Sequence, residues 1–364
     1  MRTYLKFSYV LIFIIILFLP FVSTTLGFNL DASLNEKRAK AAKPVFNGDG
    51  VKYIKKYYKF FIDNFTGRDV CIGLYNNFKF YILGESTVPD RVLIGKDNYL
   101  FYSKSKDEKT IEDYQGLISV SEQQINEIND ELKKLNQWLS ANGIDFFLII
   151  APDKHTIYPE KMPDYISRGS SSATDRIIPY LVQHNIYIID LRGPLKKAKS
   201  MNDELYYKTD THWNSLGAYI GYCEIIKSLS VNYSDVRAIK INLKNIKFTA
   251  YANAGDLYDM LGIKDYKFYR DAVLHFRKNY KTIESTDKLI VTEGPVKSPR
   301  AVIYRDSFCG ALQPMLSNNF SYVSYISSHK IYTIDRDYIL KIKPDILFIE
   351  IVERHLKYLS IKMI

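Results

Sequence analysis

From residue 119 onward, hydrophobic and polar positions follow the pattern of helices that alternate with buried strands. Apolar residues recur at helical spacing from Ile125 to Leu139, and Gly143 ends this helix. Ser119 and Glu122 have the spacing of a capping box at its start. The same pattern predicts helices over about 174–184, from Asn214, over 308–317 and over 335–341, and strands over 144–150, 186–189, 301–304, 321–326 and 346–351. This alternation predicts an α/β fold with a doubly wound parallel sheet of about five strands.

The first residues of the chain have a different pattern. An apolar run covers residues 7–28, and Arg2 and Lys6 precede it. An apolar stretch of this length can cross a bilayer as a helix. Since no clear small-residue cleavage site follows it, a retained anchor is favoured over a cleavable signal peptide. Basic residues lie on both sides, so charge alone does not orient the segment. We expect residues 1–29 to be a transmembrane signal anchor, with the short tail inside and the rest of the chain outside the cytoplasm.

The segment over residues 30–115 has shorter patterns. A polar helix is expected over residues 35–41, and apolar and aromatic side chains recur at roughly helical spacing over 51–66. Residues 91–94 and 99–102 are predicted to be the strands of a hairpin. We expect this segment to pack on the domain that follows it.

The domain over residues 116–364 is interrupted once. Residues 231–297 are mostly polar and contain short alternating runs, which are typical of strands rather than of long helices. We interpret them as a β-rich insertion with some antiparallel strands in an otherwise parallel α/β domain.

The composition argues against several functions and indicates few. The formal net charge is +10, but the lysines are scattered and no nucleic-acid-binding motif is present, so a nucleic-acid partner is not expected. The 30 tyrosines could stack on sugars, although most are expected in the core and the sheet. The cysteines Cys71, Cys223 and Cys309 form no CxxC pair, which argues against a zinc site and a disulfide scaffold.

Two stretches carry candidate chemistry. Asp210 and His212 are separated by one residue, so the carboxylate can orient the imidazole and leave its other nitrogen free as a base. Ser307 follows a predicted buried strand and precedes a helix, at the sheet edge where α/β sites form. Alternatives remain at this point. Ser307 or Asp306 can simply cap the helix, and the Asp–His pair can be structural or bind a metal, although no third ligand is close in sequence.

The two stretches resemble known sequences. Residues 210–214 with Gly217 and Ala218, and later 306–308, are similar to the SGNH-hydrolase-like domain of the alginate O-acetyltransferase family, whose members acetylate exopolysaccharides. The resemblance extends in the same order over further short segments: 35–38, 63–68, 95–102, 151–154, 158–160 and Pro163. It implies a flavodoxin-like sheet and covers most of residues 30–355.

The resemblance implies roles for individual residues. Ser307 matches the family's nucleophile, His212 its base and Asp210 the acid that orients the base, and no metal is implied. Arg305 departs from the family, because it replaces the glycine of a Gly-Asp-Ser motif.

Three residues are predicted to contact substrate. Lys154 follows the 144–150 strand at the same sheet edge as Ser307, and Tyr158 belongs to the matching Tyr-Pro-Glu segment. Arg305 stands directly before the Asp-Ser pair. We expect Lys154 to lie near the mouth of the site; the alternative is an exposed loop lysine.

The resemblance also implies partners and a location. Acetyl-CoA is cytoplasmic, so family members typically receive acetyl groups from a membrane-bound O-acyltransferase and need no soluble cofactor at this site. We therefore expect a polysaccharide acceptor, a membrane-bound O-acyltransferase as donor, and a single N-terminal helix in a bacterial inner membrane. The catalytic domain is expected in the periplasm or otherwise outside the cytoplasm.

The function predicted from the sequence is a serine-dependent O-acetyltransferase in exopolysaccharide biosynthesis, acting on alginate or another cell-surface or secreted polysaccharide. One alternative is an acetyl esterase with the same triad, which differs only in using water as the acceptor. Another is a non-catalytic surface protein that binds polysaccharide through its tyrosines. The sequence does not distinguish the first alternative, and the complete triad argues against the second.

Overall fold

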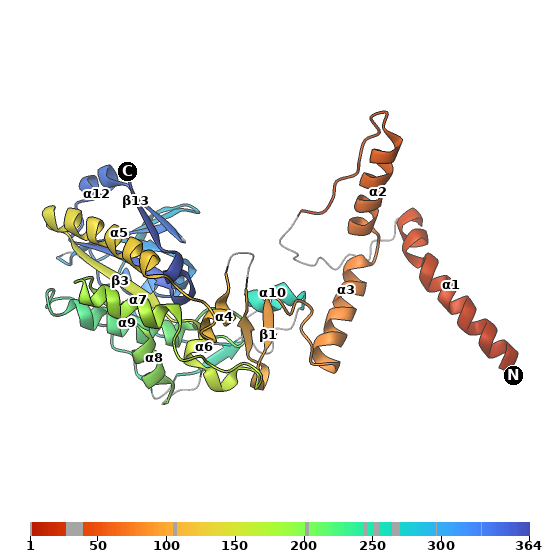
Figure 1. The fold of residues 1–364 in the computed structure, drawn as a ribbon, viewed down its shortest axis with the longest axis horizontal. Helices are drawn as coiled ribbons and strands as arrows, with labels where there is room; N and C mark the ends of the chain where they lie inside the picture. Colours follow the sequence, from red (N-terminus) through yellow and green to blue (C-terminus); the bar gives the residue numbers. More distant parts are fainter. Residues whose placement is uncertain are drawn as a thin grey trace. The chain divides into compact units, whose positions relative to one another are not determined.

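The computed structural model describes residues 2–26, 39–104, 108–200, 204–243, 246–250, 255–263, 270–295, 297–328 and 330–364. The chain divides into two compact units (Figure 1). The smaller unit comprises Met1–Pro89 and Tyr258–Asp265, and the larger comprises Asp90–Leu257 and Tyr266–Ile364. The larger unit therefore begins at Asp90 and contains the residues of the predicted hairpin.

The regular secondary structure in the described residues of the smaller unit is helical. Its helices are α1 (Arg2–Leu26), α2 (Gly50–Asn64), α3 (Arg68–Asn77) and the π-helix η1 (Phe78–Ile82), and α10 (Asp256–Leu261) lies at the boundary of the units. α2 agrees with the predicted helix over residues 51–66, and Asp49 caps it by accepting from the Lys52 N–H. Of the polar helix predicted over 35–41, residues 39–41 are not helical and the rest lies outside the described residues.

The predicted membrane anchor is not supported. α1 covers most of the segment concerned. Within the described residues, however, no helix combines the length and the apolar character needed to cross a membrane.

The larger unit is built on a mixed sheet of seven strands in the order β4-β3-β12-β9-β10-β8-β7. The first five strands are parallel, as the alternating pattern predicted. β8 and β7 add an antiparallel edge from within the predicted insertion. The strands are β3 (Asp145–Ala151), β4 (Ile188–Asp190), β7 (Lys281–Ser285), β8 (Leu289–Glu293), β9 (Arg300–Arg305), β10 (Tyr322–Ser327) and β12 (Ile346–Val352).

Helices cover both faces of this sheet (Figure 1). Alternate residues of β3 point to opposite faces, so Leu148 and Ile150 join one core while Phe147 and Ile149 join the other. The first core includes α5 (Glu122–Ala141), α7 (Ala173–Gln183) and α12 (Arg336–Ile342). The second includes α8 (Arg192–Lys199), α9 (Ser215–Leu229), the 3₁₀ helix η5 (Ser307–Ala311) and α11 (Gln313–Leu316). The sheet is therefore doubly wound.

Two helix starts test the capping predictions. Asn214 caps α9, because its side-chain oxygen accepts from the Gly217 N–H at 3.0 Å, as predicted. α5 has a capping box, but Ser121 and Gln124 form it, so the assignment to residues 119 and 122 was wrong by two positions.

Short elements complete the larger unit. The predicted hairpin is present as β1 (Val92–Ile94) and β2 (Leu100–Tyr102). The Leu100 N–H donates to the carbonyl of Lys208 at 2.8 Å, so the hairpin contacts the segment just before Asp210. The remaining elements are η2 (Lys96–Asn98), α4 (Thr110–Tyr114), α6 (Lys154–Ile157), η3 (Pro159–Lys161), β5 (Phe248–Ala250), β6 (Arg270–Ala272), β11 (Ile331–Ile334), η6 (Glu353–Tyr358) and β13 (Ser360–Met363).

Candidate active site

The carboxyl ends of β3, β12 and β9, which are adjacent in the sheet, are each followed by polar residues. Asp153 and Lys154 follow β3, Glu353 and Arg354 follow β12, and Asp306 with Ser307 follows β9. Ligands of open α/β sheets bind at this kind of edge. The chemistry-bearing residues predicted from the sequence therefore share one edge of the sheet.

The turn that carries Ser307 is fixed by Asp306. The buried Asp306 carboxylate accepts from the Phe308 N–H at 2.9 Å and from the Val352 N–H at 2.7 Å. Asp306 is thus the cap of η5 and also ties it to the end of β12. Because Asp306 takes the capping role, the Ser307 hydroxyl is not needed for it, and the Ser307 side chain stays exposed.

A buried acid lies behind this turn. Glu350 of β12 is 0% exposed, and its Oε2 accepts from the Asp306 N–H at 3.1 Å. Its other oxygen has no partner among the described residues. Burial and the neighbouring Asp306 carboxylate raise the pKa of Glu350 well above its usual range, which favours the neutral acid.

Asp210, His212 and Ser307 form one continuous line of contacts. His212 Nδ1 lies 2.6 Å from Asp210 Oδ1, and His212 Nε2 lies 2.7 Å from Ser307 Oγ. An ionised carboxylate only accepts, so the proton of a neutral imidazole sits on Nδ1, and Nε2 is left to accept from the serine hydroxyl. The structure therefore brings together all three residues of the predicted triad.

The electrostatics suit a base that is held next to an ionised acid. Burial alone would lower the pKa of His212, but the hydrogen bond and charge of Asp210 outweigh it, and the pKa is raised. Burial alone would raise the pKa of Asp210, but the hydrogen bond and charge of His212 outweigh it, and the pKa is lowered. Asp210 thus remains charged while His212 gains basicity.

A tryptophan fixes the spacing of the base and the serine. Trp213 follows His212, Phe308 follows Ser307, and the Trp213 indole N–H donates to the Phe308 carbonyl at 3.0 Å. Both side chains are 1% exposed, and their rings meet edge to face at 5.3 Å. This bond joins the immediate neighbours of His212 and Ser307, so it constrains the separation of those two side chains.

Lys154 lies at the predicted edge but is buried under the loop that carries the acid. Its side chain is 4% exposed, and its ammonium donates to the carbonyls of Tyr207 at 2.9 Å, Lys208 at 3.1 Å and Asp210 at 2.6 Å. Burial lowers the pKa of Lys154 to about 7, against the opposing charge of Asp210. All three donors are engaged with backbone, so this placement fits a support for the loop and not the predicted contact with substrate.

The other two predicted substrate contacts differ from each other. Tyr158 is 1% exposed, and its hydroxyl accepts from the Leu205 N–H at 2.8 Å. It is a core residue with no surface for a sugar, which corrects the prediction. Arg305 is half-buried beside the serine turn and donates to the Asp306 carbonyl at 3.2 Å. Its role toward substrate stays a prediction.

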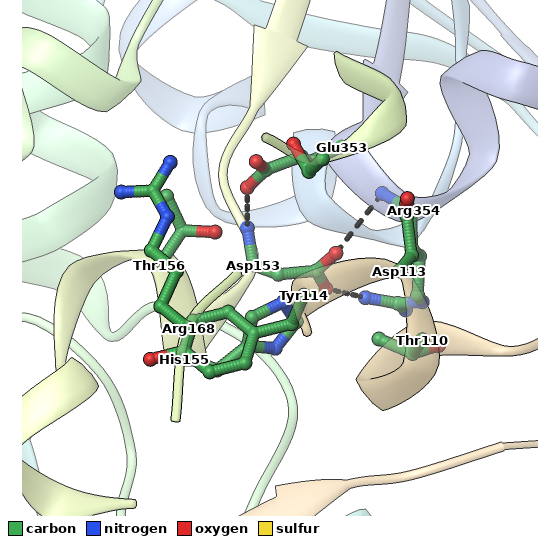
Figure 2. A pocket seen from close by; sticks show the side chains of 10 residues that line it. Thr110, Asp113, Tyr114, Asp153, His155, Thr156, Arg168, Glu353 and Arg354 are labelled. Atoms are coloured by element: carbon green, nitrogen blue, oxygen red, sulfur yellow. Dashed lines mark hydrogen bonds and ion pairs between the residues drawn. The ribbon is translucent and has the colours of Figure 1, made fainter. Parts of the chain in front are cut away.

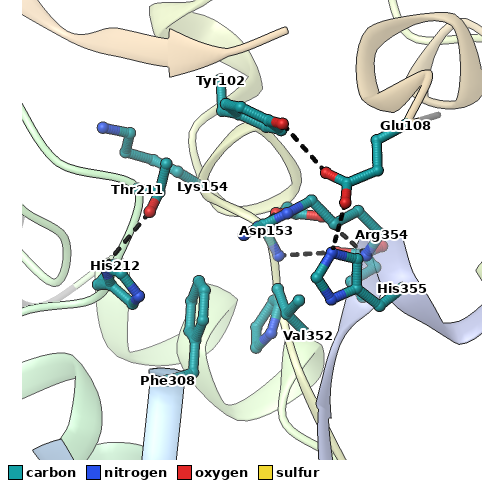
Figure 3. Close-up of polar contacts among 12 residues, drawn as sticks. Tyr102, Glu108, Asp153, Lys154, Thr211, His212, Phe308, Val352, Arg354 and His355 are labelled. Carbon is teal, nitrogen blue, oxygen red and sulfur yellow. Dashed lines mark hydrogen bonds and ion pairs between the residues drawn. The ribbon is translucent and has the colours of Figure 1, made fainter. Parts of the chain in front are cut away.

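A buried ionic cluster joins the ends of β3 and β12 beside the triad (Figure 2). The Asp153 N–H donates to Glu353 Oε2 at 3.0 Å, and Arg354 pairs with the Asp153 carboxylate. The Arg354 guanidinium also lies over the Phe308 ring, 5.6 Å from its centre (Figure 3). Burial raises the pKa of Glu353 to about 7. The cluster therefore contacts the residue that follows Ser307.

A third carboxylate bears on the metal alternative. One oxygen or nitrogen each from Asp210, His212 and Asp256 lies within 4.8 Å of the others, a grouping that could hold a metal ion. However, both Asp256 oxygens accept from Thr211, at 2.8 and 2.6 Å, and Asp210 Oδ1 is engaged by the imidazole. A cation would have to replace these hydrogen bonds, so the present contacts fit a hydrogen-bonded acid cluster better.

Comparison with known proteins identifies the family. Residues 92–320 match the family described as "SGNH hydrolase-like domain, acetyltransferase AlgX". The chain belongs to this AlgX family. The match covers more than half of the chain and contains Asp210, His212 and Ser307, so the resemblance seen in the sequence is confirmed.

Individual proteins with similar sequences or structures are consistent with this family assignment. The chain is 25% identical over 197 residues to the probable alginate O-acetylase AlgJ of Pseudomonas fluorescens, covering 51% of this chain and 44% of the relative. It is 27% identical over 140 residues to the probable alginate O-acetylase AlgJ of Pseudomonas aeruginosa, covering 35% and 30%. The chain thus spans less than half the length of these relatives. Among solved structures, Bacillus cereus PatB1 with a sulfonyl adduct has a similar fold, with a TM-score of 0.53 at 16% identity, covering 73% of this chain and 98% of that one.

Sequence reasoning missed several residues of this AlgX-family site. Trp213 and Asp153 stood in segments already singled out, but an indole donor and an ion pair leave no pattern that reveals their partners. Asp256 lies 44 positions beyond His212, inside the predicted insertion, and carried no signal of its own. Only the fold brings it to the triad.

The position of Lys154 predicts an effect on stability. Replacing it in Lys154→Met removes its three hydrogen bonds to backbone carbonyls and leaves the buried Asp210 carbonyl without this donor, so the free energy of unfolding should fall by about 3 kcal/mol. Lys227→Met is the control, because the Lys227 side chain is 74% exposed. Denaturant unfolding of both variants measures the difference, and equal midpoints would show that the three bonds contribute nothing.

The raised pKa of Glu350 predicts a dependence of stability on pH. Its folded-state pKa lies above its unfolded value, so the wild type loses stability as pH rises above about 4.5 toward the folded-state pKa. Glu350→Gln has the same shape and no titrating group. The variant should therefore gain stability relative to the wild type between pH 4.5 and 8. Unfolding curves at both pH values test this, and a constant difference would contradict a raised pKa of Glu350.

Proposed function

We propose that the chain is a serine-dependent O-acetyltransferase that moves an acetyl group through an ester on Ser307 to a hydroxyl of a polysaccharide. The observation that carries the proposal is the unbroken line from Asp210 through His212 to Ser307 in a member of the AlgX family. Alginate is the substrate named for the AlgJ relatives, and it is the first acceptor to test.

The first half-reaction forms the acyl-serine. His212 Nε2 takes the proton of the Ser307 hydroxyl, which is 2.7 Å away, as Oγ attacks the carbonyl carbon of the acetyl donor. The tetrahedral intermediate collapses, the bond to the leaving group breaks, and the leaving group receives the proton from His212. Asp210 stabilises the imidazolium that exists between these steps.

The second half-reaction runs the same chemistry with a new alcohol. A sugar hydroxyl gives its proton to His212 as its oxygen attacks the ester carbonyl on Ser307. Collapse of this intermediate breaks the bond to Oγ, and His212 returns the proton to Ser307. The product is the O-acetylated sugar, and the enzyme is restored.

One backbone group is suited to bind the developing oxyanion. The Ser307 N–H lies at the start of η5 and makes no hydrogen bond within the part of the chain that the structure describes. The sequence had suggested neighbouring amides as well, but the Phe308 N–H already donates to Asp306. We therefore assign only the Ser307 N–H to this role.

The proposal includes the donor and the location predicted from the family resemblance. The acetyl group would come from a membrane-bound O-acyltransferase, and the reaction would take place outside the cytoplasm. Support for this part comes from the chemistry alone: the triad needs an activated acetyl group and no cofactor of its own.

Replacement of the nucleophile gives the main test. Ser307→Ala should abolish acetyl transfer, because no other described group meets His212 Nε2 as an alcohol. Stability should change by less than about 1 kcal/mol, since Asp306 and not Ser307 caps η5. Acetylation of a bacterial polysaccharide, measured by mass spectrometry at equal protein abundance, checks this. Equal acetylation by the wild type and the variant would reject Ser307 as the nucleophile.

Variants of His212 and Asp210, together with a chelator, distinguish the catalytic triad from a metal site. His212→Ala should be as inactive as Ser307→Ala because the triad works as a unit, whereas Asp210→Asn should keep some activity. A chelator should leave the wild type active. Loss of wild-type activity on chelation, with recovery on adding zinc, would favour the metal alternative for Asp210 and His212.

A competition between acceptors separates transfer from hydrolysis. With p-nitrophenyl acetate as donor, the wild type should release p-nitrophenol and leave acetyl groups on an added alginate oligosaccharide. Ser307→Ala should do neither. Release of p-nitrophenol with free acetate as the only acetyl product would identify an esterase instead.

A further inference from the structure

A second acid, Asp256, is hydrogen-bonded to the catalytic loop from both its backbone and its side chain. The Asp256 N–H donates to Asp210 Oδ2 at 3.0 Å. In return, Asp256 Oδ1 accepts from the Thr211 N–H at 2.8 Å, and Oδ2 accepts from the Thr211 hydroxyl at 2.6 Å. Asp256 therefore contacts the catalytic acid and the residue between that acid and His212.

The backbone around Asp256 is built for this close approach. The Leu257 N–H donates to the Thr209 carbonyl at 3.2 Å. Gly255 has a φ of +85°, and a Cβ added there would lie 2.4 Å from the Thr209 carbonyl oxygen. Only glycine fits this conformation and this contact without strain. Three consecutive residues, Gly255 to Leu257, thus pack their backbone against residues 209–211.

The Asp256 carboxylate also lies close to the imidazole. Asp256 Oδ2 is 3.9 Å from His212 Nδ1, which is longer than a hydrogen bond but close enough for a strong interaction between charges. Asp210 is the nearer acid, at 2.6 Å. The imidazole ring is therefore faced by two carboxylates on its Nδ1 side and by the Ser307 hydroxyl on its Nε2 side.

Two cationic side chains also lie near the catalytic residues. Arg354 lies over the neighbouring Phe308 ring and lowers the pKa of His212, while Lys154 donates to the backbone of the Asp210 loop (Figure 3). Burial and Arg354 lower the pKa of His212, but the hydrogen bond and charge of Asp210 and the charge of Asp256 outweigh them, so this pKa is raised overall. Burial and the nearby Asp210 charge raise the pKa of Asp256 itself.

We propose that Asp256 is a positioning residue that aligns the Asp210–His212 loop and adds a second negative charge that favours the imidazolium. The proposal rests on the function proposed above, in which His212 must carry a proton between the two halves of each transfer. Its two parts can be separated, because the hydrogen bonds and the charge of Asp256 respond to different substitutions.

Two variants separate the effect of the Asp256 charge from that of its hydrogen bonds, and a third is the reserve. Asp256→Asn removes the charge but keeps the shape, an oxygen that can accept from the Thr211 N–H, and the backbone bond to Asp210. Thr211→Val keeps the charge of Asp256 and removes the hydroxyl that donates to Asp256 Oδ2. It also removes the contact of that hydroxyl with His212 Nδ1, at 3.3 Å (Figure 3). Asp256→Ala removes the charge and both side-chain bonds, and it is a second charge-free variant if Asp256→Asn folds poorly.

The first readout needs no substrate. An NMR titration of labelled histidine, with the His212 signal assigned by its absence in His212→Gln, measures the pKa of the imidazole. We expect this pKa to be lower in Asp256→Asn and in Asp256→Ala than in the wild type, and not lowered in Thr211→Val. An unchanged His212 titration in the two charge-free variants would overturn the charge part of the proposal, whatever the enzyme's activity.

The second readout is the pH profile of kcat/KM with p-nitrophenyl acetate. His212 must be neutral to accept the serine proton, so activity falls as pH drops through its pKa. The acid limb should move to lower pH in Asp256→Asn and stay in place in Thr211→Val. Asp256→Ala should in addition lose activity at every pH, on the order of 100-fold, because the loop is misaligned.

The outcomes distinguish this inference from the proposed function. A wild type without transfer or hydrolysis would reject the function, while the NMR titration would still report on Asp256. An active wild type whose alanine variant keeps full activity and the same His212 titration would reject the positioning role alone. Equal thermal unfolding of the wild type and Asp256→Asn ensures that any shift in titration is not a folding defect.

Discussion

The buried carboxylate of Asp306 is the group on which the geometry of the site depends. It accepts N–H bonds from Phe308, within the serine turn, and from Val352, at the end of the central strand β12. Both bonds are charge-assisted, and such bonds are shorter and stronger than neutral ones. They hold the serine turn against the sheet, and Trp213 then ties the histidine loop to the same turn. The distance from His212 to Ser307 follows from these contacts.

The fold was predictable where periodicity reflects burial. The five parallel strands are covered on both faces, so each appears in the sequence as an apolar run, and their order along the chain could be predicted. β7 could not be predicted as part of the sheet, because all five of its residues are exposed and its place is set by pairing with β8. The capping box of α5 was misplaced because residues 119 to 122 offer two serines, and tertiary packing selects which one begins the helix.

The site was predictable only in part, for a related reason. The Asp-x-His motif predicted Asp210 as the acid and His212 as the base, and a predicted strand followed by a turn indicated Ser307. Burial of Lys154 and Tyr158 was not predictable, since lysine and tyrosine near a sheet edge are compatible with both a surface and a support role. The role of Asp256 could not be predicted from the sequence, because its hydrogen bond to Asp210 depends on a close contact at Gly255 between segments that are distant in the sequence.

The place of β12 in the sheet has a consequence for synthesis of the protein. β12 is the last of the parallel strands in the chain, yet it lies between β3 and β9, and its Val352 N–H is one of the two bonds to Asp306. A growing chain that already contains His212 and Ser307 still lacks β12, and with it one of the two N–H groups that hold the serine turn. The 2.7 Å contact between His212 Nε2 and Ser307 Oγ therefore depends on a strand that is synthesised after both residues.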